Sequence, residues 1–393
     1  MSRLLIIGAS FLQLPAIVKA KELGHYVAVA DYNPEAVGIP FADEYFNAST
    51  IDPEAVVRAA RQFKPDGVMT LATDMPMRSV AAVAEELGLP GISTDTAVKA
   101  TDKAEMIKAF KEHGVPSPWY FVINDEVDFL KHRDSFTYPC IMKPTDNAGS
   151  RGVMLIHNVS ELDGAYEFSH GQGRCGAVIV EEYMTGHEVS VEIIAHNGEV
   201  DVLAVTDKLT TGAPHFVELG HSQPSMLPPD SLKRIREVAA RAVKAVGITD
   251  GPAHVEIMLT SDGPKMIELG ARMGGDCITT HLVPLSTGID MIKATIDISL
   301  GLNPDITPKL HKGSAVRFIA PSPGTVKRIS GVEYAKTIPD VKEVRLSITE
   351  GDEVKEIESS LDRSGYVIAQ SADARSAIER CESAINSIKI ITK

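Results

Sequence analysis

The first part of the chain alternates between short apolar runs and segments of helical spacing, and this alternation limits the fold more than any other feature. Strand-like and helix-like segments follow one another at residues 4–7, 14–23, 26–30, 53–62, 67–71 and 75–87. Parallel strands need a crossover connection, which a helix usually supplies, so this order is typical of a parallel sheet with helices on its faces. We therefore expect a Rossmann-like α/β domain over residues 1–96.

The turn after the first expected strand does not predict a dinucleotide site. It reads Gly-Ala-Ser-Phe-Leu-Gln over residues 8–13 and has only one of the glycines that the dinucleotide fingerprint requires. NAD and FAD are therefore not expected here. The ends of the strands are instead expected to contact part of a substrate.

Two alternating segments predict a β-hairpin that carries a pair of carboxylates. His254–Leu259 and Lys265–Leu269 are joined by a turn with Gly and Pro. Pairing across this turn brings Glu256 and Glu268 to one face, out of otherwise apolar strands. Mg²⁺ takes carboxylate and phosphate oxygens, so this pair suits a metal–nucleotide complex. Arg272 follows on a Gly-rich turn, where a guanidinium can hold an anion bidentately; three ordinary surface charges are the alternative.

Two lysines and a Gly-rich segment are candidates for binding phosphate. Lys103 lies at the start of a helix capped by Thr101 or Asp102, where the helix dipole favours a shared anion; a solvated lysine is the alternative. Lys143 ends an apolar strand and leads into residues 146–153, whose glycines let backbone N–H groups approach phosphate oxygens. This is not a Walker loop, and an ordinary Gly-rich hairpin turn is the alternative.

Three further segments carry polar candidates. Residues 181–184 follow an apolar strand and suit a hinge whose backbone reads an adenine edge, with Glu188 near the ribose hydroxyls; a hairpin edge with solvated acids is the alternative. Residues 206–228 are polar and punctuated by Gly and Pro, so we expect a long functional loop that holds Glu218 and His221. Arg317, inside a C-terminal strand, is either paired structurally or directed at substrate.

Composition excludes some classes of partner. With 393 residues, 44% apolar and 23% charged, the chain is expected to be a soluble globular protein of two or three domains. Its formal net charge of −14 argues against nonspecific binding to nucleic acid or to an anionic membrane. The four cysteines form no CxxC pair, which fits reduced thiols in a cytoplasm. No apolar run approaches the roughly 18–20 residues of a membrane span.

Several motifs, taken in order, resemble the ATP-grasp superfamily over nearly the whole chain. They are TDK (101–103), YPCIMKP (138–144), DNAGSRGV (146–153), EEYMTGHE (181–188) and HVE…IELGAR (254–272). Within the superfamily, GASFLQLPAI, FVELGHSQPS, RMGGDCITTHLVPLSTGID and AVRFIAPSPGTV are similar to the branch of L-amino-acid ligases and related carboxylate–amine ligases. The resemblance implies an α/β and α+β fold. A pre-ATP-grasp domain (1–96) precedes an ATP-grasp domain (97–305, with subdomains of about 97–175 and 176–305) and a small C-terminal α+β lobe (306–393).

The resemblance also implies roles for residues at matching positions. The expected ATP-binding residues are Lys103, Lys143, Gly149, Ser150, Arg151, Gly152, Glu181, Glu182, Tyr183, Met184 and Glu188. Glu256 and Glu268 match the magnesium carboxylates, with Mn²⁺ as an alternative metal. Lys143 and Arg272 are the expected catalytic residues, and the expected substrate-binding residues are Glu218, His221, Arg272, Asp276 and Arg317. One departure is that Gly270 stands where many members have Asn.

The implied reaction joins a carboxylate, expected to belong to an amino acid, to an amine through an acyl phosphate, with release of ADP and phosphate. The expected partners are these small molecules and a second copy of the chain, not nucleic acid or a membrane. A biotin-carboxylase-like enzyme or a purine-pathway ligase is an alternative, although the chain has no biotin-attachment MKM. A nucleotide-binding regulatory protein without catalysis is an alternative of another class, which Gly270 favours and the intact lysines and glutamates oppose.

Overall fold

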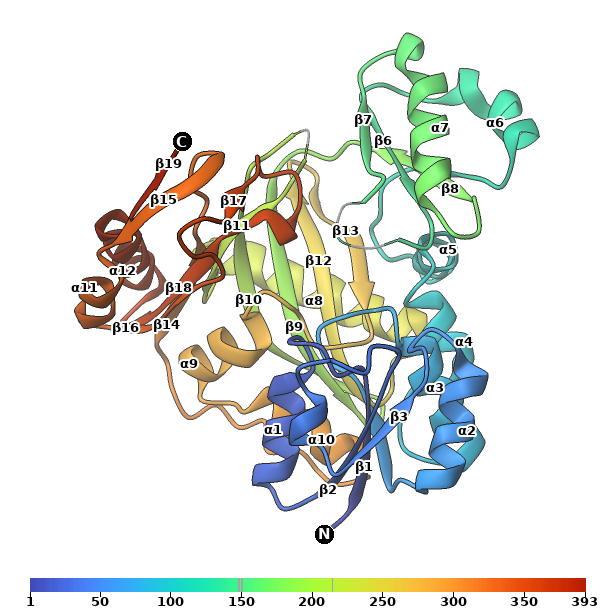
Figure 1. Cartoon of the computed structure of the whole chain (residues 1–393). Helices are drawn as coiled ribbons and strands as arrows, with labels where there is room; N and C mark the ends of the chain where they lie inside the picture. Colours follow the sequence, from blue (N-terminus) through green and yellow to red (C-terminus); the bar gives the residue numbers. More distant parts are fainter. Residues whose placement is uncertain (148, 150, 214) are drawn as a thin grey trace.

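The structure is a computed structural model that describes residues 1–147, 149, 151–213 and 215–393. Within these residues the strands form four sheets, and Figure 1 shows how they are arranged around the centre of the molecule. Ser150, which was predicted to belong to the phosphate-binding segment, lies outside the described residues. The mixed α/β architecture agrees with the predicted fold class.

The N-terminal sheet is parallel and has the strand order β3-β2-β1-β4, as the alternation predicted. Its strands are β1 (Arg3–Ile7), β2 (Tyr26–Asp31), β3 (Glu44–Asn47) and β4 (Gly67–Met69). Its helices are α1 (Leu14–Glu22), α2 (Pro53–Phe63) and α3 (Met77–Leu87), followed by the short α4 (Thr94–Lys99), and the 3₁₀ turn η1 is Ile39–Phe41. Alternation along β1 sends Leu5 and Ile7 toward α2 and α3, and Leu4 and Ile6 toward α1.

A small antiparallel sheet, of order β5-β8-β6-β7, forms a separate layer at the upper right of Figure 1. Helix α5 (Lys103–Glu112) leads into it, and the Asp102 carboxylate caps this helix by accepting from the amides of residues 104 and 105. The strands are β5 (Tyr120–Ile123), β6 (Cys140–Pro144), β7 (Met154–Ile156) and β8 (Val178–Glu182). Helices α6 (Glu126–His132) and α7 (Leu162–Gln172), with the 3₁₀ turns η2 (Arg133–Ser135) and η3 (Val159–Glu161), complete this layer, and Phe129 and Leu162 pack on the strands.

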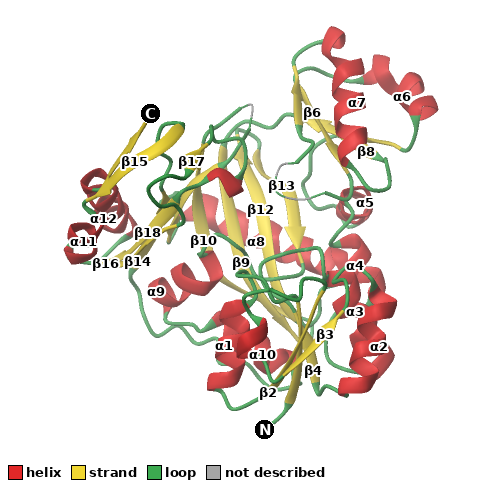
Figure 2. Ribbon diagram, in the orientation of Figure 1, coloured by secondary structure: helices red, strands yellow, loops and turns green. Residues whose placement is uncertain are grey.

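An eight-stranded sheet forms the centre of the molecule, with the order β13-β12-β9-β10-β11-β14-β18-β16 (Figure 2). Its strands are β9 (His187–His196), β10 (Glu199–Thr210), β11 (Glu218–Gln223), β12 (Gly251–Thr260), β13 (Gly263–Gly270), β14 (Gly313–Phe318), β16 (Val341–Leu346) and β18 (Gly365–Ser371). Helix α8 (Pro229–Val246), ended by Gly247 in a left-handed conformation as predicted, covers one face of β9, β10 and β12.

Two segments cross the domain borders that the sequence suggested. Helix α10 (Met291–Ser299) packs on the N-terminal sheet through Ile292 and Ile296, beside the apolar side chains of α1. The C-terminal strand β14 pairs directly with β11, so the central sheet continues into the predicted C-terminal lobe. The domain boundaries at residues 96 and 305 therefore remain a prediction.

The C-terminal segment adds helices to the end of the central sheet. Helices α11 (Val332–Thr337) and α12 (Ala374–Ser387) pack on β14, β16 and β18. A small sheet of order β17-β15-β19 is formed by β17 (Glu353–Val354), β15 (Gly324–Ser330) and β19 (Lys389–Thr392), and η5 is Ser360–Asp362. The π-helix η4 (Ile278–Leu282) and α9 (Val283–Thr287) connect the end of β13 to this region.

The prediction of a long loop over residues 206–228 is wrong in part. Strand β10 continues to Thr210 and strand β11 begins at Glu218, so these residues lie in the middle of the central sheet. Lys208 points to the sheet face opposite α8, and Asp207 points to the loop at Ser225. Because these neighbours on opposite faces are both polar, the sequence does not show the alternation of apolar and polar residues that is typical of a strand. In the described part of the chain, no helix is long and apolar enough to cross a membrane.

Candidate active site

One face of the central sheet gathers most of the polar candidates. Along β12, Val255 and Ile257 pack on the α8 side, so the alternating residues His254 and Glu256 point to the other side. Residues of β9, β10 and β11 in register with them share this face, which is also where the N-terminal domain and the small antiparallel sheet meet the central sheet. The sheet therefore presents functional side chains from neighbouring strands to one place.

Glu256 and Glu268 are direct cross-strand partners, which confirms the predicted hairpin register. Oε2 of Glu256 lies 3.1 Å from Nζ of Lys208, and Oε1 lies 3.3 Å from Nε2 of His254. Burial would raise the pKa of Glu256, but Lys208 and His254 outweigh it and hold that pKa well below its usual value. Oε2 of Glu268 lies 3.1 Å from Nζ of Lys103. Glu256 is therefore held ionised, and both carboxylates lie on one face next to a lysine ammonium group.

The two predicted phosphate lysines lie opposite this pair. Lys143 on β6 is buried, with its Nζ 2.6 Å from Oε2 of Glu181. Burial lowers the pKa of Lys143, but the carboxylates of Glu181, Glu268 and Glu256 outweigh it and raise the pKa above its ordinary value. Lys103, at the start of α5, also donates to the carbonyl of Asn147 at 2.7 Å. Two ammonium groups from the small sheet and its leading helix thus face the two carboxylates of the central sheet.

The glycines of the predicted phosphate segment have the backbone conformation that requires them. Gly149 and Gly152 have φ values of +67° and +81°, in the left-handed region. A Cβ atom at Gly152 would also lie 2.8 Å from Cγ of Pro144, directly after Lys143. Arg151, between them, is exposed. The backbone of Gly152 therefore lies close to the end of the strand that carries Lys143.

The predicted adenine hinge lies at the end of β8. Glu181 pairs with Lys143, and Glu182 pairs with Lys265 of β13, with its oxygens 2.9 and 3.0 Å from Nζ. The ring of Tyr183 lies 6.5 Å from that of Phe216, and Met184 is half-buried. Because both acidic side chains are paired with lysines, the backbone of this segment is the part that is available to hydrogen-bond with the edge of a base.

Arg272 is held by a residue that the sequence reasoning did not single out. Its Nε and Nη2 donate to the two carboxylate oxygens of Asp74, at 2.9 and 2.8 Å. Asp74 follows β4 in the N-terminal domain, at the carboxyl end of a parallel sheet, which is the signal that could have indicated it. A Cβ atom at Gly270 would lie 2.3 Å from Oδ1 of Asp74. The glycine that replaces the family asparagine therefore makes room for Asp74.

Glu218, His221 and Asp276 come together around a residue of the C-terminal segment. Arg363 donates to both carboxylate oxygens of Asp276, at 2.8 and 2.7 Å, and to the carbonyl of Glu218 at 3.3 Å, while its guanidinium stacks on the ring of Phe318. His221 is buried, with Nε2 3.5 Å from Oδ2 of Asp276, and its Nδ1 has no hydrogen-bond partner among the described residues. Asp276 has a φ of +51°, in the left-handed region that only a few per cent of non-glycine residues adopt.

Arg317 is not brought together with these residues. Its Nη1 donates to the carbonyls of His221 and Val316, and Nε lies 3.9 Å from Oε1 of Glu382 on α12. Its neighbour on β14, Phe318, is on the opposite face with Arg363. The structure thus places the Arg317 side chain toward α12, in line with the structural alternative for this residue.

Two further groups were missed by the sequence reasoning. Lys208 of β10 is almost fully buried and contacts Glu188, Glu256 and Glu218. The ring of His254 lies between Glu256 and the fully buried Glu192. Nδ1 of His254 lies 2.9 Å from Oε1 of Glu192. Burial lowers the pKa of His254, but Glu192 and Glu256 outweigh it and raise the pKa to about 9. A histidine two residues before a predicted metal carboxylate was the available signal.

The two hairpin carboxylates fit a magnesium ion that is shared with a nucleotide. Their oxygens are the hard ligands that Mg²⁺ prefers, and Mg²⁺ is commonly held by one or two carboxylates together with substrate phosphates. The neighbouring Lys103 and Lys143 suit the phosphates themselves. Among the described residues there is no group of three or more His, Cys, Asp or Glu side chains arranged to hold a metal.

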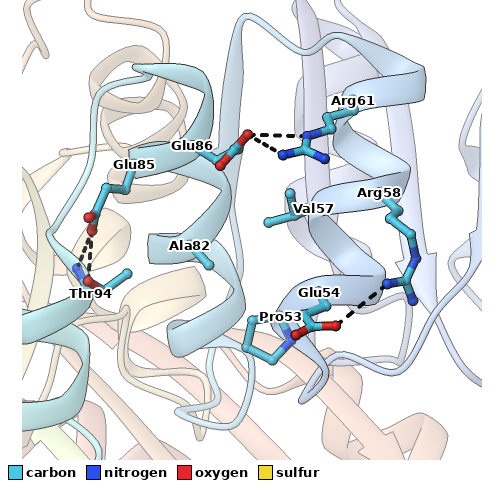
Figure 3. A pocket seen from close by; sticks show the side chains of 9 residues that line it. All are labelled: Pro53, Glu54, Val57, Arg58, Arg61, Ala82, Glu85, Glu86 and Thr94. Atoms are coloured by element: carbon cyan, nitrogen blue, oxygen red, sulfur yellow. Dashed lines mark hydrogen bonds and ion pairs between the residues drawn. The ribbon is translucent and has the colours of Figure 1, made fainter.

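A separate surface groove of about 720 Å³ lies between α2 and α3 (Figure 3). Among its charged side chains, Arg61 pairs with Glu86 and Arg58 with Glu54, while Glu85 accepts hydrogen bonds from Thr94. None of the candidate residues lines it. We therefore assign the active site to the face of the central sheet and not to this groove.

Comparison with known proteins identifies related domains over two parts of the chain. Residues 136–280 match the ATP-grasp domain, and residues 317–393 match the L-amino acid ligase C-terminal domain 2. The L-arginine-specific L-amino acid ligase of Bacillus subtilis is 26% identical over 282 residues, which cover 70% of this chain and 67% of that protein.

Solved structures show the same fold over the whole chain. The L-amino acid ligase of Bacillus licheniformis superposes with a TM-score of 0.86 at 24% identity, covering 100% of this chain and 99% of the other. A phosphoribosylglycinamide synthetase of Anaerococcus prevotii superposes with a TM-score of 0.81 at 25% identity, covering 100% of both chains. The protein is thus an ATP-grasp ligase. Its domains and its relatives, which include L-amino acid ligases, support an ADP-forming ligase that makes carbon–nitrogen bonds.

Proposed function

We propose that this enzyme joins the carboxylate of an amino acid to the amine of a second amino acid through an acyl phosphate. The observation that carries the proposal is the meeting of three groups of side chains on one sheet face. Glu256 and Glu268 lie opposite Lys103 and Lys143, with Arg272 beside them. The match of residues 317–393 to an L-amino acid ligase domain supports amino-acid substrates.

In the first step, a substrate carboxylate oxygen attacks the γ-phosphorus of ATP, the bond from this phosphorus to the bridging oxygen breaks, and ADP leaves. Lys103 and Lys143 are placed to hold the phosphates and to offset the charge that develops on them. Mg²⁺ bound by Glu256 and Glu268 would supply further charge neutralisation at the phosphates. Gly149 and Gly152, next to the end of the strand that carries Lys143, would help to exclude water, which would otherwise hydrolyse the acyl phosphate.

In the second step, the amine attacks the acyl carbon and phosphate leaves, which forms the amide bond. The guanidinium of Arg272, fixed by Asp74, is placed to stabilise the oxyanion of the tetrahedral intermediate. Glu218 carries a negative charge that suits the ammonium group of an amino acid, and His221 and Asp276 lie next to it. These residues form the proposed amino-acid subsite, and a homodimer remains part of the proposal.

The test is phosphate and ADP release with Mg-ATP against a matrix of single amino acids, amino-acid pairs, bicarbonate and formate. We expect release that requires an amino acid, with a dipeptide mass for the productive pair. Hydroxylamine should trap the acyl phosphate as a hydroxamate when the amine is omitted. Release with bicarbonate or formate and no amino acid would overturn the substrate assignment. It would favour a purine-pathway type of ligase, an alternative for which the superposition on the phosphoribosylglycinamide synthetase is the supporting observation.

A further inference from the structure

Lys208 connects three carboxylates that belong to three different parts of the proposed site. Its Nζ lies 2.5 Å from Oε1 of Glu188 on β9, 3.1 Å from Oε2 of Glu256 on β12 and 3.6 Å from Oε1 of Glu218 on β11. Only 4% of the lysine side chain is exposed. The proposed function assigns Glu256 to the metal and Glu218 to the amino-acid ammonium, and the sequence predicts that Glu188 lies near the ribose, so a single side chain contacts all three proposed binding positions.

The charges of this cluster do not balance. Three carboxylates share one lysine ammonium, which leaves two negative charges on side chains that are largely buried, with 19–26% of each exposed. His254 also contacts Glu256, but it shares its charge with the buried carboxylate of Glu192. Buried charges are costly unless they are paired, so the cluster favours the arrival of further cations. A divalent metal at Glu256 and an ammonium group at Glu218 are cations of the required kind.

We propose that Lys208 is a positioning residue that occupies the shared cation position before the ligands bind, and that it couples metal binding at Glu256 to ammonium binding at Glu218. This inference rests on the proposed function of these two glutamates. A metal ion that binds Glu256 releases the lysine toward Glu188 and Glu218. Conversely, an ammonium group that binds Glu218 leaves the lysine to the other two carboxylates.

The chemistry of lysine suits this role. Its ammonium is a compact charge at the end of a flexible four-carbon chain, so a small rotation moves it from one carboxylate to the next. The three carboxylates come from neighbouring strands of one sheet, and Lys208 lies in register with His221 on β11. A lysine with a purely structural role would need one fixed partner, whereas this one has three that the proposed ligands also require.

The experiment measures Mn²⁺ binding in the absence of nucleotide and amino acid, from the electron paramagnetic resonance signal of free Mn²⁺. We compare wild type, Lys208→Met, Lys208→Arg and, as a matched control, Lys293→Met, whose lysine pairs with Asp297 on α10 outside the site. We expect Lys208→Met to bind Mn²⁺ about tenfold more tightly, because the competing charge is gone, and the other two to stay within about twofold of wild type. Unchanged or weaker binding by folded Lys208→Met would overturn the proposal, as would no Mn²⁺ binding by any of the four proteins at millimolar concentration.

A double-mutant comparison tests the coupling and covers a folding failure of the single variant. Glu218→Gln should weaken Mn²⁺ binding in wild type, because Lys208 then has one carboxylate fewer to hold it away from Glu256. In the Lys208→Met/Glu218→Gln protein, which loses one charge of each sign, this effect should shrink at least about threefold. Equal effects of Glu218→Gln in both backgrounds would mean that Lys208 does not carry the coupling.

The two proposals fail in different ways. Amino-acid-dependent ADP release by wild type, together with Mn²⁺ affinities that ignore residue 208, would overturn the role of Lys208 and leave the proposed function standing. The expected Mn²⁺ affinities without any amino-acid-dependent ADP release would overturn the amino-acid substrate, and would leave only the competition between Lys208 and the metal.

Discussion

The hairpin β12–β13 and the strand pair β10–β11 lie in the same sheet and present side chains to the same face, but they arrange charge differently. On the hairpin, each carboxylate contacts a cationic side chain outside the Lys208 cluster: Glu268 contacts Lys103, and Glu256 contacts His254 in addition to Lys208. On β10–β11, one lysine is shared among carboxylates of three strands. Each hairpin carboxylate thus has a cationic partner besides the shared lysine, whereas Glu218 of β11 forms its ion pair with that shared lysine.

This difference predicts separate roles for the two strand pairs. A carboxylate that is fixed by its own partners can hold a metal in one position, which phosphoryl transfer requires. A carboxylate whose partner also has other choices can exchange that partner for a ligand, which recognition requires. We therefore expect changes on the hairpin to affect turnover, and changes on β11 to affect the concentration of amino acid that the enzyme needs.

The largest expected effect comes from breaking the hairpin pair. Glu268→Gln keeps the size of the side chain but removes the charge opposite Glu256, and it should lower kcat at least about a thousandfold. Steady-state ADP release at saturating substrates measures this. The thermal unfolding midpoint is the control and should stay close to that of wild type, since Glu268 is partly exposed. Near wild-type kcat in a folded variant would contradict the metal assignment.

The next effect concerns His254, which stabilises the hairpin side of the site in a pH-dependent way. Its pKa is about 9 in the folded protein and about 6.5 in an unfolded chain. A raised pKa means that the stabilisation is fully present below about pH 6.5 and is lost as the pH rises through about 9, a change of up to about 3 kcal/mol. The stability difference between wild type and His254→Asn, measured by urea unfolding in EDTA, should therefore shrink between pH 6.5 and 9.5. A constant difference over this range would show that the histidine is neutral in the folded protein.

Much of the hairpin half could be predicted from the sequence because its signals are local. Two isolated acids in alternating apolar strands, joined by a tight turn, fix both the secondary structure and the register, and the structure pairs Glu256 with Glu268. The lysines Lys103 and Lys143 were found for similar reasons, since each lies at the end of a recognisable element.

The other half could not be predicted because its signals are not local. Thr206, Asp207 and Lys208 are polar on both faces of β10, so the strand looked like a loop. Asp74 lies 198 residues from its hydrogen-bond partner Arg272, and Arg363 lies 87 residues from its partner Asp276. Only the folded chain brings such residues together, and no pattern within either segment announces the contact.

A smaller effect is expected on the strand pair β10–β11. Glu218→Gln should raise the KM for the amino acid about 10- to 100-fold, because the ammonium loses a charged partner, a change of about 1.4–2.7 kcal/mol. It should change kcat and the KM for ATP much less. Initial rates with one substrate varied at a time measure the three constants. A fall in kcat with an unchanged amino-acid KM would contradict the prediction that the hairpin serves turnover and β11 serves recognition.

The smallest effect is expected for Arg317, which separates residues near β11 from residues of the site. It lies in register with Gly220, two residues after Glu218, but its guanidinium is directed to backbone carbonyls and toward Glu382 on α12. Burial lowers its pKa, and Nε has no hydrogen-bond partner among the described residues, so the charge itself is not well compensated. Burying a charge that is poorly paired is itself costly, so an apolar side chain of similar length is expected to be close to neutral for stability. Arg317→Met should therefore leave the amino-acid KM within about twofold and change the free energy of unfolding by about 1 kcal/mol or less. If its KM instead rose as much as that of Glu218→Gln at an unchanged unfolding midpoint, Arg317 would have to reach the substrate, and the face of β14 toward α12 would become part of the site.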